Sequence, residues 1–414
     1  MKSIKLLEKI KKIIHSNETL KTSRLQENAF IRNRKMPFSS ALAFMLDMRK
    51  TTLQTRLNMY FERNEKSEPM SQQAFSKLRA NFDHTPFAAM LGAIVTEEYS
   101  GKQDLPRWNG YHLFGVDGSF LQLPRTHELY REFGIHGHQE QCPCAGISVL
   151  FDVLHGWVLD PIITRATMNE RTECENHMTF LKEKMPHIAD NSIVLLDRGY
   201  PSEELFKAIA AKGIKFLARC KSNYCRKTQS APMGDSIIEL NCGLTVRVYK
   251  FALPSGEIET LLTNLFELQA EEIPKLYSLR WGVETAYFRF KREICVEKFS
   301  GKTPNSIRQD FWACMVLLNS VAVFQREADD VVGERQKGKS LKYQNRARTS
   351  DLIITLRDQF IFVTLCGRPM FEDFEVERII KTMARVVSPV RTGRSFPRIH
   401  RPFLVANSNL KSHL

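Results

Sequence analysis

The sequence predicts an α/β protein in which a sheet-forming middle follows a helical N-terminal region. Two short, almost wholly apolar segments, 112–116 (HLFGV) and 192–196 (SIVLL), have the composition of buried strands, and each runs directly into an aspartate. Segment 146–154 (GISVLFDVL) is a third candidate for a buried central strand. Helical patterns at 169–184 and after Pro201 separate the strands. Strands that alternate with helices in this way indicate an α/β architecture.

Helical patterns fill the first 100 residues. Segments 1–15, 38–48 and 52–61 are amphipathic or apolar at helical spacing, and Ser71 is placed to cap a further helix. On that last helix we expect these polar side chains to be exposed: Gln72, Gln73, Ser76, Lys77 and Arg79. Short helices joined by brief turns predict either a DNA-binding helical module or a plain helical bundle, and the residues alone leave both open.

The positive charge is concentrated at the two ends of the chain. The 414 residues carry a formal net charge of +14. Residues 1–100 hold 17 Lys and Arg against 10 acidic residues, and residues 331–414 hold 16 against 7, whereas the middle holds 27 against 29. Basic ends around a centre that keeps its carboxylates indicate a polyanionic partner, with nucleic acid the leading candidate and an anionic membrane surface the alternative.

The chain shows neither a secretory signal nor an apolar run of the roughly 18 residues that a membrane span needs. The longest apolar stretch, 311–324, is interrupted by Asn319 and Ser320. The nine cysteines form no pair of CxxC units of the kind that binds zinc, so we expect buried or idle thiols. These features predict a cytosolic globular protein.

After the second aspartate the pattern changes to strands and then returns to helices. Residues 214–265 contain four strand-like segments broken by turns, which predicts a β insertion. Segments 304–324 and 350–365 read as helices, with a polar, basic linker predicted over 329–348. The end, 391–402, is extended and basic, and is either a phosphate-binding arm or a solubilising tail.

Segment 277–291 (YSLRWGVETAYFRFK) places four polar side chains on one side when it is read as a helix. At about 100° per residue, they lie within a stripe roughly 60° wide. The four are Tyr277, Arg280, Glu284 and Lys291. A second stripe, which we expect to pack on a core, is apolar: Leu276, Leu279, Val283, Phe290 and Ile294. By spacing alone, the polar stripe is also typical of an ordinary solvated ion-pair face.

The candidate catalytic residues are Asp117, Asp197 and Glu284. The two aspartates end predicted strands, where a side chain leaves the core yet keeps a rigid support, and Glu284 comes from the predicted helix. Three carboxylates are the oxygen ligands that a pair of Mg²⁺ ions requires, and such a pair catalyses attack on a phosphorus by water or a 3′-hydroxyl. Arg280 and Lys291 are placed to bind backbone phosphates. The alternative is that each aspartate only begins a turn.

The spacing Tyr-x2-Arg-x3-Glu-x6-Lys resembles the signature of DDE transposases of bacterial insertion sequences, specifically insertion-sequence family four. It is fully matched by Tyr277, Arg280, Glu284 and Lys291. The aspartates within GVDGS and LLDRGY look like that family's first and second catalytic aspartates. The resemblance covers roughly residues 25–400 in overall layout.

The resemblance implies a ribonuclease-H-like catalytic core with a β-strand insertion. Combined with the segment patterns, it predicts a helical DNA-binding domain over residues 1–100 and a catalytic domain over 110–325, with the insertion at 214–268. A helical, basic region over 330–414 is expected to serve DNA binding or dimerisation. Some relatives stabilise a flipped base with a tryptophan of the insertion. The aromatic residues here are instead Phe216, Tyr224, Tyr249, Phe251 and Phe266.

The function implied is cut-and-paste transposition of an insertion sequence. The expected cofactors are two Mg²⁺ ions per site, with Mn²⁺ as a substitute, and the expected metal ligands are Asp117, Asp197 and Glu284. Tyr277, Arg280 and Lys291 are the expected DNA-binding residues. The partners implied are double-stranded DNA, both the terminal repeats of the element and the target, and a second copy of the chain in a synaptic complex. The location implied is the bacterial cytoplasm, at the nucleoid, and no membrane is involved. The alternative is a DNA-binding protein of transposase descent that no longer cuts and acts as a repressor or architectural factor.

Overall fold

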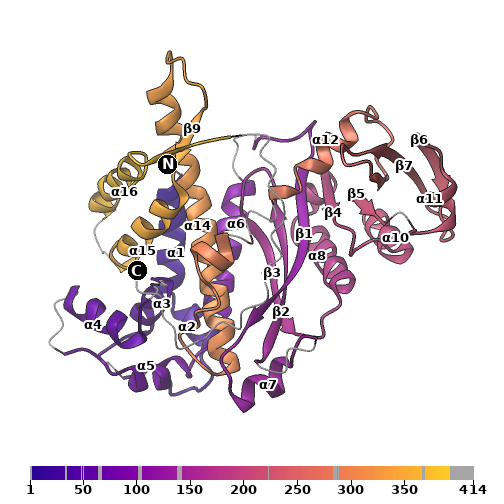
Figure 1. Cartoon of the computed structure of the whole chain (residues 1–414). Coiled ribbons are helices and arrows are strands. Elements are labelled where there is room, and N and C mark those ends of the chain that lie inside the picture. Colours follow the sequence, from indigo (N-terminus) through magenta and orange to yellow (C-terminus); the bar gives the residue numbers. More distant parts are fainter. Residues whose placement is uncertain are drawn as a thin grey trace. The chain divides into compact units, whose positions relative to one another are not determined.

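The chain divides into two compact units in the computed structural model (Figure 1). The helical unit comprises residues 1–101, 121–144 and 289–414, and the sheet unit comprises residues 102–120 and 145–288. The structure describes residues 2–391 apart from 33–34, 48, 50, 64–67, 101–104, 138–141, 222, 283–286, 288 and 366–368. For 289–290, 358–365 and 369–373 it describes the backbone alone.

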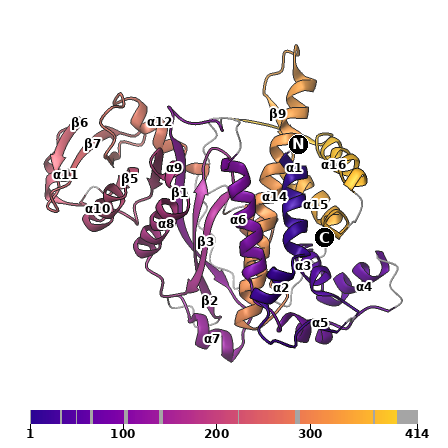
Figure 2. The same cartoon turned by 180° about the vertical axis from the view of Figure 1, so that it is seen from behind.

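The helical unit joins helices from both ends of the chain. Its longest helix, α14, contacts α1, α3, α6 and α15, and Figures 1 and 2 both show α1 and α6 beside it. The helices are α1 (Lys2–Ile14), α2 (Asn17–Ser23), α3 (Phe38–Leu46), α4 (Leu53–Arg63), α5 (Gln72–Arg79), α6 (Thr85–Ser100), α7 (His127–Phe133), η1 (Arg289–Glu293), α14 (Pro304–Gln336), α15 (Thr349–Leu365) and α16 (Pro369–Met383). Two short antiparallel strands, β9 (Asn345–Ala347) and β10 (Val387–Pro389), complete it.

Helix α14 is a core helix of this unit. Thr303 caps it by accepting a hydrogen bond from the N–H of Ser306, and Pro304 occupies its first turn, where a missing N–H costs nothing. Among the described helices, α14 is long and apolar enough to cross a membrane, but 89% of its apolar window is buried inside the protein. Burial against neighbouring helices accounts for its apolar composition.

The sheet unit is built on one eight-stranded sheet of order β3-β2-β1-β4-β5-β8-β7-β6. β1, β4 and β5 are parallel, and the pairs β2–β3, β5–β8, β8–β7 and β7–β6 are antiparallel. The strands are β1 (His112–Gln122), β2 (Cys144–Asp152), β3 (Val158–Arg165), β4 (Ser192–Leu196), β5 (Lys215–Cys220), β6 (Gly234–Glu239), β7 (Thr245–Ala252) and β8 (Ile258–Thr263). Its helices are α8 (Glu170–Lys184), α9 (Pro186–Ala189), α10 (Glu203–Ala211), α11 (Arg226–Ser230) and α12 (Glu272–Ser278).

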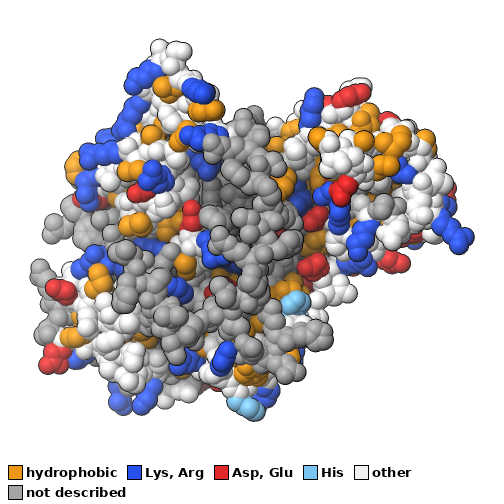
Figure 3. Space-filling model, viewed as in Figure 1, with side chains coloured by type: hydrophobic (Ala, Val, Ile, Leu, Met, Phe, Trp, Pro, Cys, Tyr) orange, Lys and Arg blue, Asp and Glu red, His pale blue; other side chains and the backbone are white. Residues whose placement is uncertain are grey.

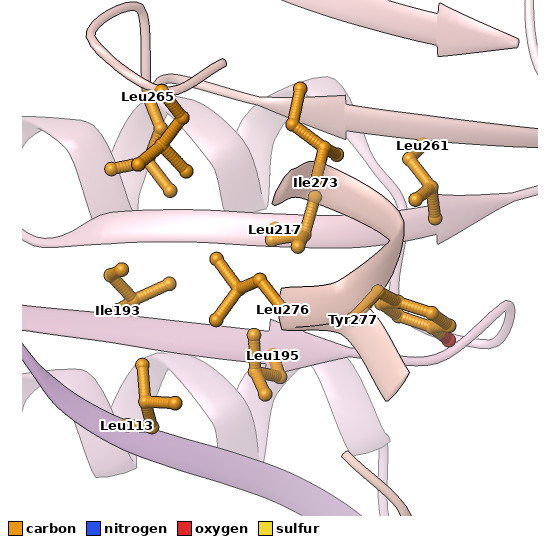
Figure 4. Packing of buried hydrophobic residues seen from close by; sticks show 10 residues of the cluster. Leu113, Ile193, Leu195, Leu217, Leu261, Leu265, Ile273, Leu276 and Tyr277 are labelled. Carbon is orange, nitrogen blue, oxygen red and sulfur yellow. The ribbon is translucent and has the colours of Figure 1, made fainter. Parts of the chain in front are cut away.

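Helix α12 covers one face of this sheet through a buried apolar cluster. Ile273 and Leu276 of α12 lie over leucine and isoleucine side chains of β1, β4, β5 and β8, and other helices lie behind the sheet (Figure 4). Burying these side chains stabilises the unit by about 1.5–3 kcal/mol each. Tyr277 closes the cluster at the end of β4, which fixes the position of the residues that follow α12.

The structure confirms most of the predicted elements. The mixed α/β class, the helical first 100 residues, the strands around Asp117 and Asp197, and the strands of the insertion are all present. Residues 329–336, predicted as linker, instead continue α14. α6 and α16 lie in regions predicted to be helical, although their own bounds were not predicted. The predicted domain division and its roles remain predictions.

Arg79 is also placed differently from the prediction. It is 3% exposed, whereas Gln72, Gln73, Ser76 and Lys77 on the same helix are exposed as expected. Its guanidinium donates to Gln309, to Ser300 and, at 2.8 Å, to the carboxylate of Asp310. Arg79 therefore fixes α5 to α14 inside the helical unit.

Candidate active site

Asp117 and Asp197 belong to neighbouring parallel strands. β1 pairs with β4 as far as Gly115 opposite Leu195. Continuing that register by two residues brings Asp117 beside Asp197, because neighbouring strands lie about 4.8 Å apart. Asp197 directly follows β4, as predicted. The prediction that the first strand ends at Asp117 is wrong, since β1 runs on to Gln122 and only its pairing with β4 stops earlier.

The carboxyl group of Asp117 lies among other negative charges. One of its oxygens accepts a hydrogen bond from the N–H of Gly118 at 3.0 Å. Burial raises the pKa of Asp117 to about 6, and the charges of Glu170 and Asp197 raise it further, against the opposing effects of Arg280 and the Gly118 N–H. Crowded carboxylates of this kind favour the approach of a cation.

Tyr277 and Arg280 reach Asp197 from the end of α12. The Tyr277 hydroxyl donates to one carboxylate oxygen of Asp197 at 3.4 Å, and a guanidinium nitrogen of Arg280 lies 3.8 Å from the other. The Arg280 guanidinium also lies 5.8 Å from the centre of the Tyr277 ring. Arg280 is 6% exposed, so its charge is held in place by the protein around it. Two predicted DNA-binding residues and two predicted catalytic residues thus meet where the pairing of β1 with β4 ends.

The helix predicted over 277–291 is interrupted in the described residues. α12 ends at Ser278, and the N–H groups of Leu279, Arg280 and Gly282 bond to carbonyls three residues back, which makes a tighter turn than an α-helix. This turn aims Arg280 toward Asp197. Glu284, the third predicted catalytic residue, lies outside the described residues.

Lys291 lies in η1, in the helical unit. The five-residue π-helical turn that carries it was not predicted, because the α-helical periodicity of the sequence gives no sign of the wider turn. The described residues therefore unite four of the six predicted site residues.

A family model for the transposase DDE domain matches residues 108–320, more than half of the chain. The chain belongs to the DDE transposase family. Its matched region contains both aspartates and the segment around Tyr277 and Arg280. The predicted resemblance is confirmed, and the protein is a DNA transposase of an insertion sequence.

Two curated proteins are similar to this transposase. It is 23% identical over 335 residues to the transposase InsG for insertion sequence element IS4 of Escherichia coli (strain K12), across 74% of this chain and 72% of that protein. It is 28% identical over 126 residues to the probable transposase for insertion sequence element IS5377 of Geobacillus stearothermophilus, across 29% of this chain and 33% of that protein. Among solved structures, the piggyBac transposase synaptic complex with hairpin DNA aligns with a TM-score of 0.49 and 12% identity, over 93% of this chain and 86% of that chain.

Three residues of the transposase's acidic site were missed by sequence reasoning. Tyr287 donates its hydroxyl to the backbone carbonyl of Asp117 at 2.7 Å. Tyr200 is 1% exposed, and burial followed by the charge of Asp117 raises its pKa well above the ordinary value. Glu170, at the start of α8, is the third. Only Tyr200 carried a local signal, since it stands within LLDRGY three residues after Asp197.

The oxygen atoms of Asp117 and Asp197 fit a divalent cation. Carboxylate oxygens are the ligands that Mg²⁺ and Mn²⁺ accept most readily. Burial is the main cause of the raised pKa of Asp117, and the smaller contributions of Glu170 and Asp197 come from negative charge that a cation would stabilise. In the described part of the chain, no group of three His, Cys, Asp or Glu side chains is arranged to hold a metal ion. Completing the predicted ligand set therefore depends on Glu284.

Proposed function

We propose that this transposase excises and inserts an insertion sequence by cut-and-paste chemistry at Asp117, Asp197 and Glu284, which would hold two Mg²⁺ ions or Mn²⁺ in their place. The observation that carries the proposal is the meeting of Asp117 and Asp197 on paired strands, with Tyr277 and Arg280 beside them. When bound, the metal ions supply activation of the attacking water or 3′-hydroxyl and stabilisation of the leaving oxygen.

The remaining side chains position the site and its DNA. Tyr277 orients the carboxylate of Asp197 through its hydroxyl, and the packing of Tyr277 in the apolar cluster limits its movement. Arg280 holds a buried positive charge near Asp197, where it attracts the phosphate to be cut. Lys291 contributes a second cation along the DNA backbone.

The core of the sheet unit is proposed to be ribonuclease-H-like. Its support is the order β3-β2-β1-β4-β5, in which an antiparallel pair, β2–β3, precedes the parallel strands β1, β4 and β5. Strands β6, β7 and β8 extend the same sheet and are the proposed β insertion over 214–268. This arrangement supports both aspartates on neighbouring strands, β1 and β4, inside the sheet, where a rigid support is available.

The basic ends of the chain are proposed to bind DNA. From the last turn of α14 to the start of α15 six exposed cations follow one another: Arg335, Lys337, Lys339, Lys342, Arg346 and Arg348. Figure 3 shows Lys and Arg side chains gathered over the end of α14, the turn toward β9, and α16. The Lys342 ammonium lies 5.6 Å, and the Arg391 guanidinium 5.5 Å, from the centre of the Tyr343 ring. Such a surface suits the phosphates of double-stranded DNA.

In this proposal two copies of the chain hold two element ends in a synaptic complex, in the bacterial cytoplasm at the nucleoid and without a membrane. Residues 1–100 act as the DNA-binding domain, residues 110–325 as the catalytic domain, and residues 330–414 in DNA binding or dimerisation. The exposed face of α5, with Gln72, Gln73, Ser76 and Lys77, supports the first assignment.

The test separates an active transposase from a descendant that binds DNA without cutting it. Purified protein is incubated with its own flanking inverted repeats and Mg²⁺, and nicked, hairpinned and joined products are resolved on denaturing gels. We expect the wild type to cut, and Glu284→Gln to bind the repeats equally well without cutting. Glu183→Gln, at the exposed far end of α8, is the matched control that retains cleavage. Cleavage by Glu284→Gln at a near-normal rate would refute the catalytic assignment, and binding without cleavage by the wild type would favour the repressor or architectural alternative.

A further inference from the structure

Three neighbouring parallel strands each carry an ionisable residue at the level of the candidate active site. β5 pairs with β4 as far as Ala218 opposite Leu196. Continuing that register by one residue places Arg219 beside Asp197, whose other neighbour in the sheet is Asp117. The row across β1, β4 and β5 therefore consists of two acidic residues followed by a cation.

Arg219 belongs to the face of the sheet that α12 covers. Side chains along a strand alternate between the two faces, so residues two positions apart share a face. Leu217 of β5 and Leu195 of β4 are both buried in the apolar cluster beneath α12, and Figure 4 shows them on neighbouring strands under that helix. Arg219 and Asp197 stand two residues after these leucines. Both side chains are therefore directed to the face on which α12 lies.

Tyr277 connects Arg219 with the rest of the site. Burial raises the pKa of Tyr277, and the charges of Arg280 and Arg219 act against that rise. Both guanidinium groups are thus near enough to influence the Tyr277 hydroxyl, which donates to Asp197 at 3.4 Å. The site therefore has two cations near this hydroxyl, one from the turn after α12 and one from β5.

The two cations differ in their partners. Arg280 is 6% exposed and lies 3.8 Å from the carboxylate of Asp197. The Arg219 side chain is 24% exposed, and one of its nitrogens lies 2.6 Å from the carboxylate of Glu259 in β8. In the described part of the chain Glu259 is its ion-pair partner, while the buried Nε of Arg219 has no hydrogen-bond partner. A guanidinium has several N–H donors, so contact with Glu259 leaves others unused.

An ion pair between neighbouring strands has an ordinary explanation. Arg219 lies opposite Leu261 of β8, and Glu259 stands two residues before Leu261 on the same strand. Opposite charges placed diagonally in this way occur in many sheets and contribute modestly to stability. That role can be met on any pair of strands. It does not explain why the pair stands at the level of Asp197, nor why a buried N–H of the guanidinium lacks an acceptor, which costs free energy unless a ligand supplies one.

A phosphate group is the anion that suits this position in a DNA transposase. A guanidinium binds phosphate through two parallel N–H donors, which gives both strength and a fixed geometry. With neighbouring strands about 4.8 Å apart, the backbone of Arg219 lies roughly 10 Å from that of Asp117, two strands away. Arg219 is therefore placed to contact a phosphate next to the one that the aspartates address, and to offset the repulsion between those aspartates and the DNA strand.

We propose that Arg219 binds a backbone phosphate of the DNA strand next to the phosphate that is cut, and that Glu259 is a positioning residue that holds Arg219 in place for this contact. The inference rests on the proposed function, since it assumes that DNA is cut at Asp117 and Asp197. It adds a DNA contact from β5, the strand from which the chain enters β6, β7 and β8.

The first test measures DNA binding by the full-length chain as a function of salt. A fluorescent duplex that carries the terminal repeat of the element is titrated without Mg²⁺, so that no cutting occurs. We expect Arg219→Gln to weaken binding roughly tenfold and to reduce the slope of log Kd against log salt concentration by roughly one. Arg226→Gln removes an exposed cation from α11, which packs on the edge strand β6, and should bind like the wild type.

A double variant keeps the test valid if the single change disturbs folding. Arg219→Gln/Glu259→Gln removes both charges, so that the net charge is unchanged and no buried carboxylate is left unpaired. We expect it to lose the same part of the salt slope as Arg219→Gln, with circular dichroism showing that it is folded. Glu259→Gln alone should weaken binding by less, because Arg219 keeps its charge but loses its support. Binding by Glu259→Gln equal to that of the wild type would remove the positioning role.

The second test identifies the phosphate. Single phosphates around the cut site are replaced by neutral methylphosphonates, and one replacement should weaken binding by the wild type roughly tenfold while weakening binding by Arg219→Gln no further. Additive losses at every position, or equal losses in Arg219→Gln and Arg226→Gln, would overturn the proposed contact. The proposed function fails by a separate result, which is that the wild type binds these duplexes but does not cut them in Mg²⁺.

Discussion

Replacing Arg79 with methionine tests whether this arginine supports the fold or contacts DNA. Arg79 and Asp310 are each 3% exposed at the side chain, and Arg79 makes further bonds to Gln309, Ser300 and the carbonyl of Ser306. Removing the arginine leaves the Asp310 carboxylate buried with only its bonds from Ser300. Breaking one side of a buried ion pair costs about 3–5 kcal/mol. We therefore expect Arg79→Met to destabilise the helical unit by that amount.

Urea unfolding followed by far-ultraviolet circular dichroism measures the loss. With a urea dependence of about 2–3 kcal/mol per M, the transition of the helical unit should move down by roughly 1–2 M. Lys77→Met, on the exposed face of the same helix, should leave the transition in place and weaken DNA binding. The double variant Arg79→Met/Asp310→Leu should recover much of the loss, since apolar residues often replace a buried pair at little cost. A midpoint for Arg79→Met equal to that of Lys77→Met would refute the structural role.

Three further predictions concern the sheet unit and the basic end. Gly118→Ala should lower stability by about 1 kcal/mol, because its Cβ would meet the movable ends of the Glu170 and Met168 side chains, and the loss should shrink in a Glu170→Ala background; equal losses in both backgrounds would contradict the contact. Burial, followed by the charge of Arg107, lowers the pKa of His112 to about 4. Between about pH 6.5 and pH 4 the unfolded chain therefore binds a proton at His112 that the folded chain does not bind. The free energy of unfolding decreases as the pH is lowered through this range. Thermal unfolding should show about 2 kcal/mol lost on going from pH 8 to pH 5 that is absent in His112→Gln. Removing residues 391–414 should weaken DNA binding and flatten its salt dependence, and an unchanged salt slope would show that this segment is idle.

Local patterns in the sequence were sufficient to predict the strands that carry the aspartates. Short apolar runs identify β1 and β4, and the polar cap Ser71 locates the start of α5 because its side chain satisfies a free N–H. The extension of α14 beyond Phe324 was harder to see, since only Ala328 and Val332 are apolar and buried on a polar helix. Their spacing of four residues was the available signal.

Contacts between distant residues could not be predicted in the same way. Periodicity placed Tyr277 and Arg280 on one face of a helix, but the tight turn after Ser278 depends on packing against the sheet. Glu170 has no distinguishing neighbour in the sequence, and its meeting with Gly118 follows from strand order. In the sequence Arg79 looks like a surface cation, because its partner Asp310 is more than 200 positions away along the chain.

The way in which β8 returns beside β5 bears on how such transposases diversify. Cys220, the last residue of β5, lies opposite Thr260 of β8, so the polypeptide leaves the central strands and rejoins them at adjacent positions. The segment between them can be lengthened, shortened or exchanged during evolution without rerouting the strands that hold Asp117 and Asp197. At the limit, a tight turn in its place would make β5 and β8 a simple hairpin. A change in this segment would therefore leave the pairing of β4 with β1 and with β5 as it is.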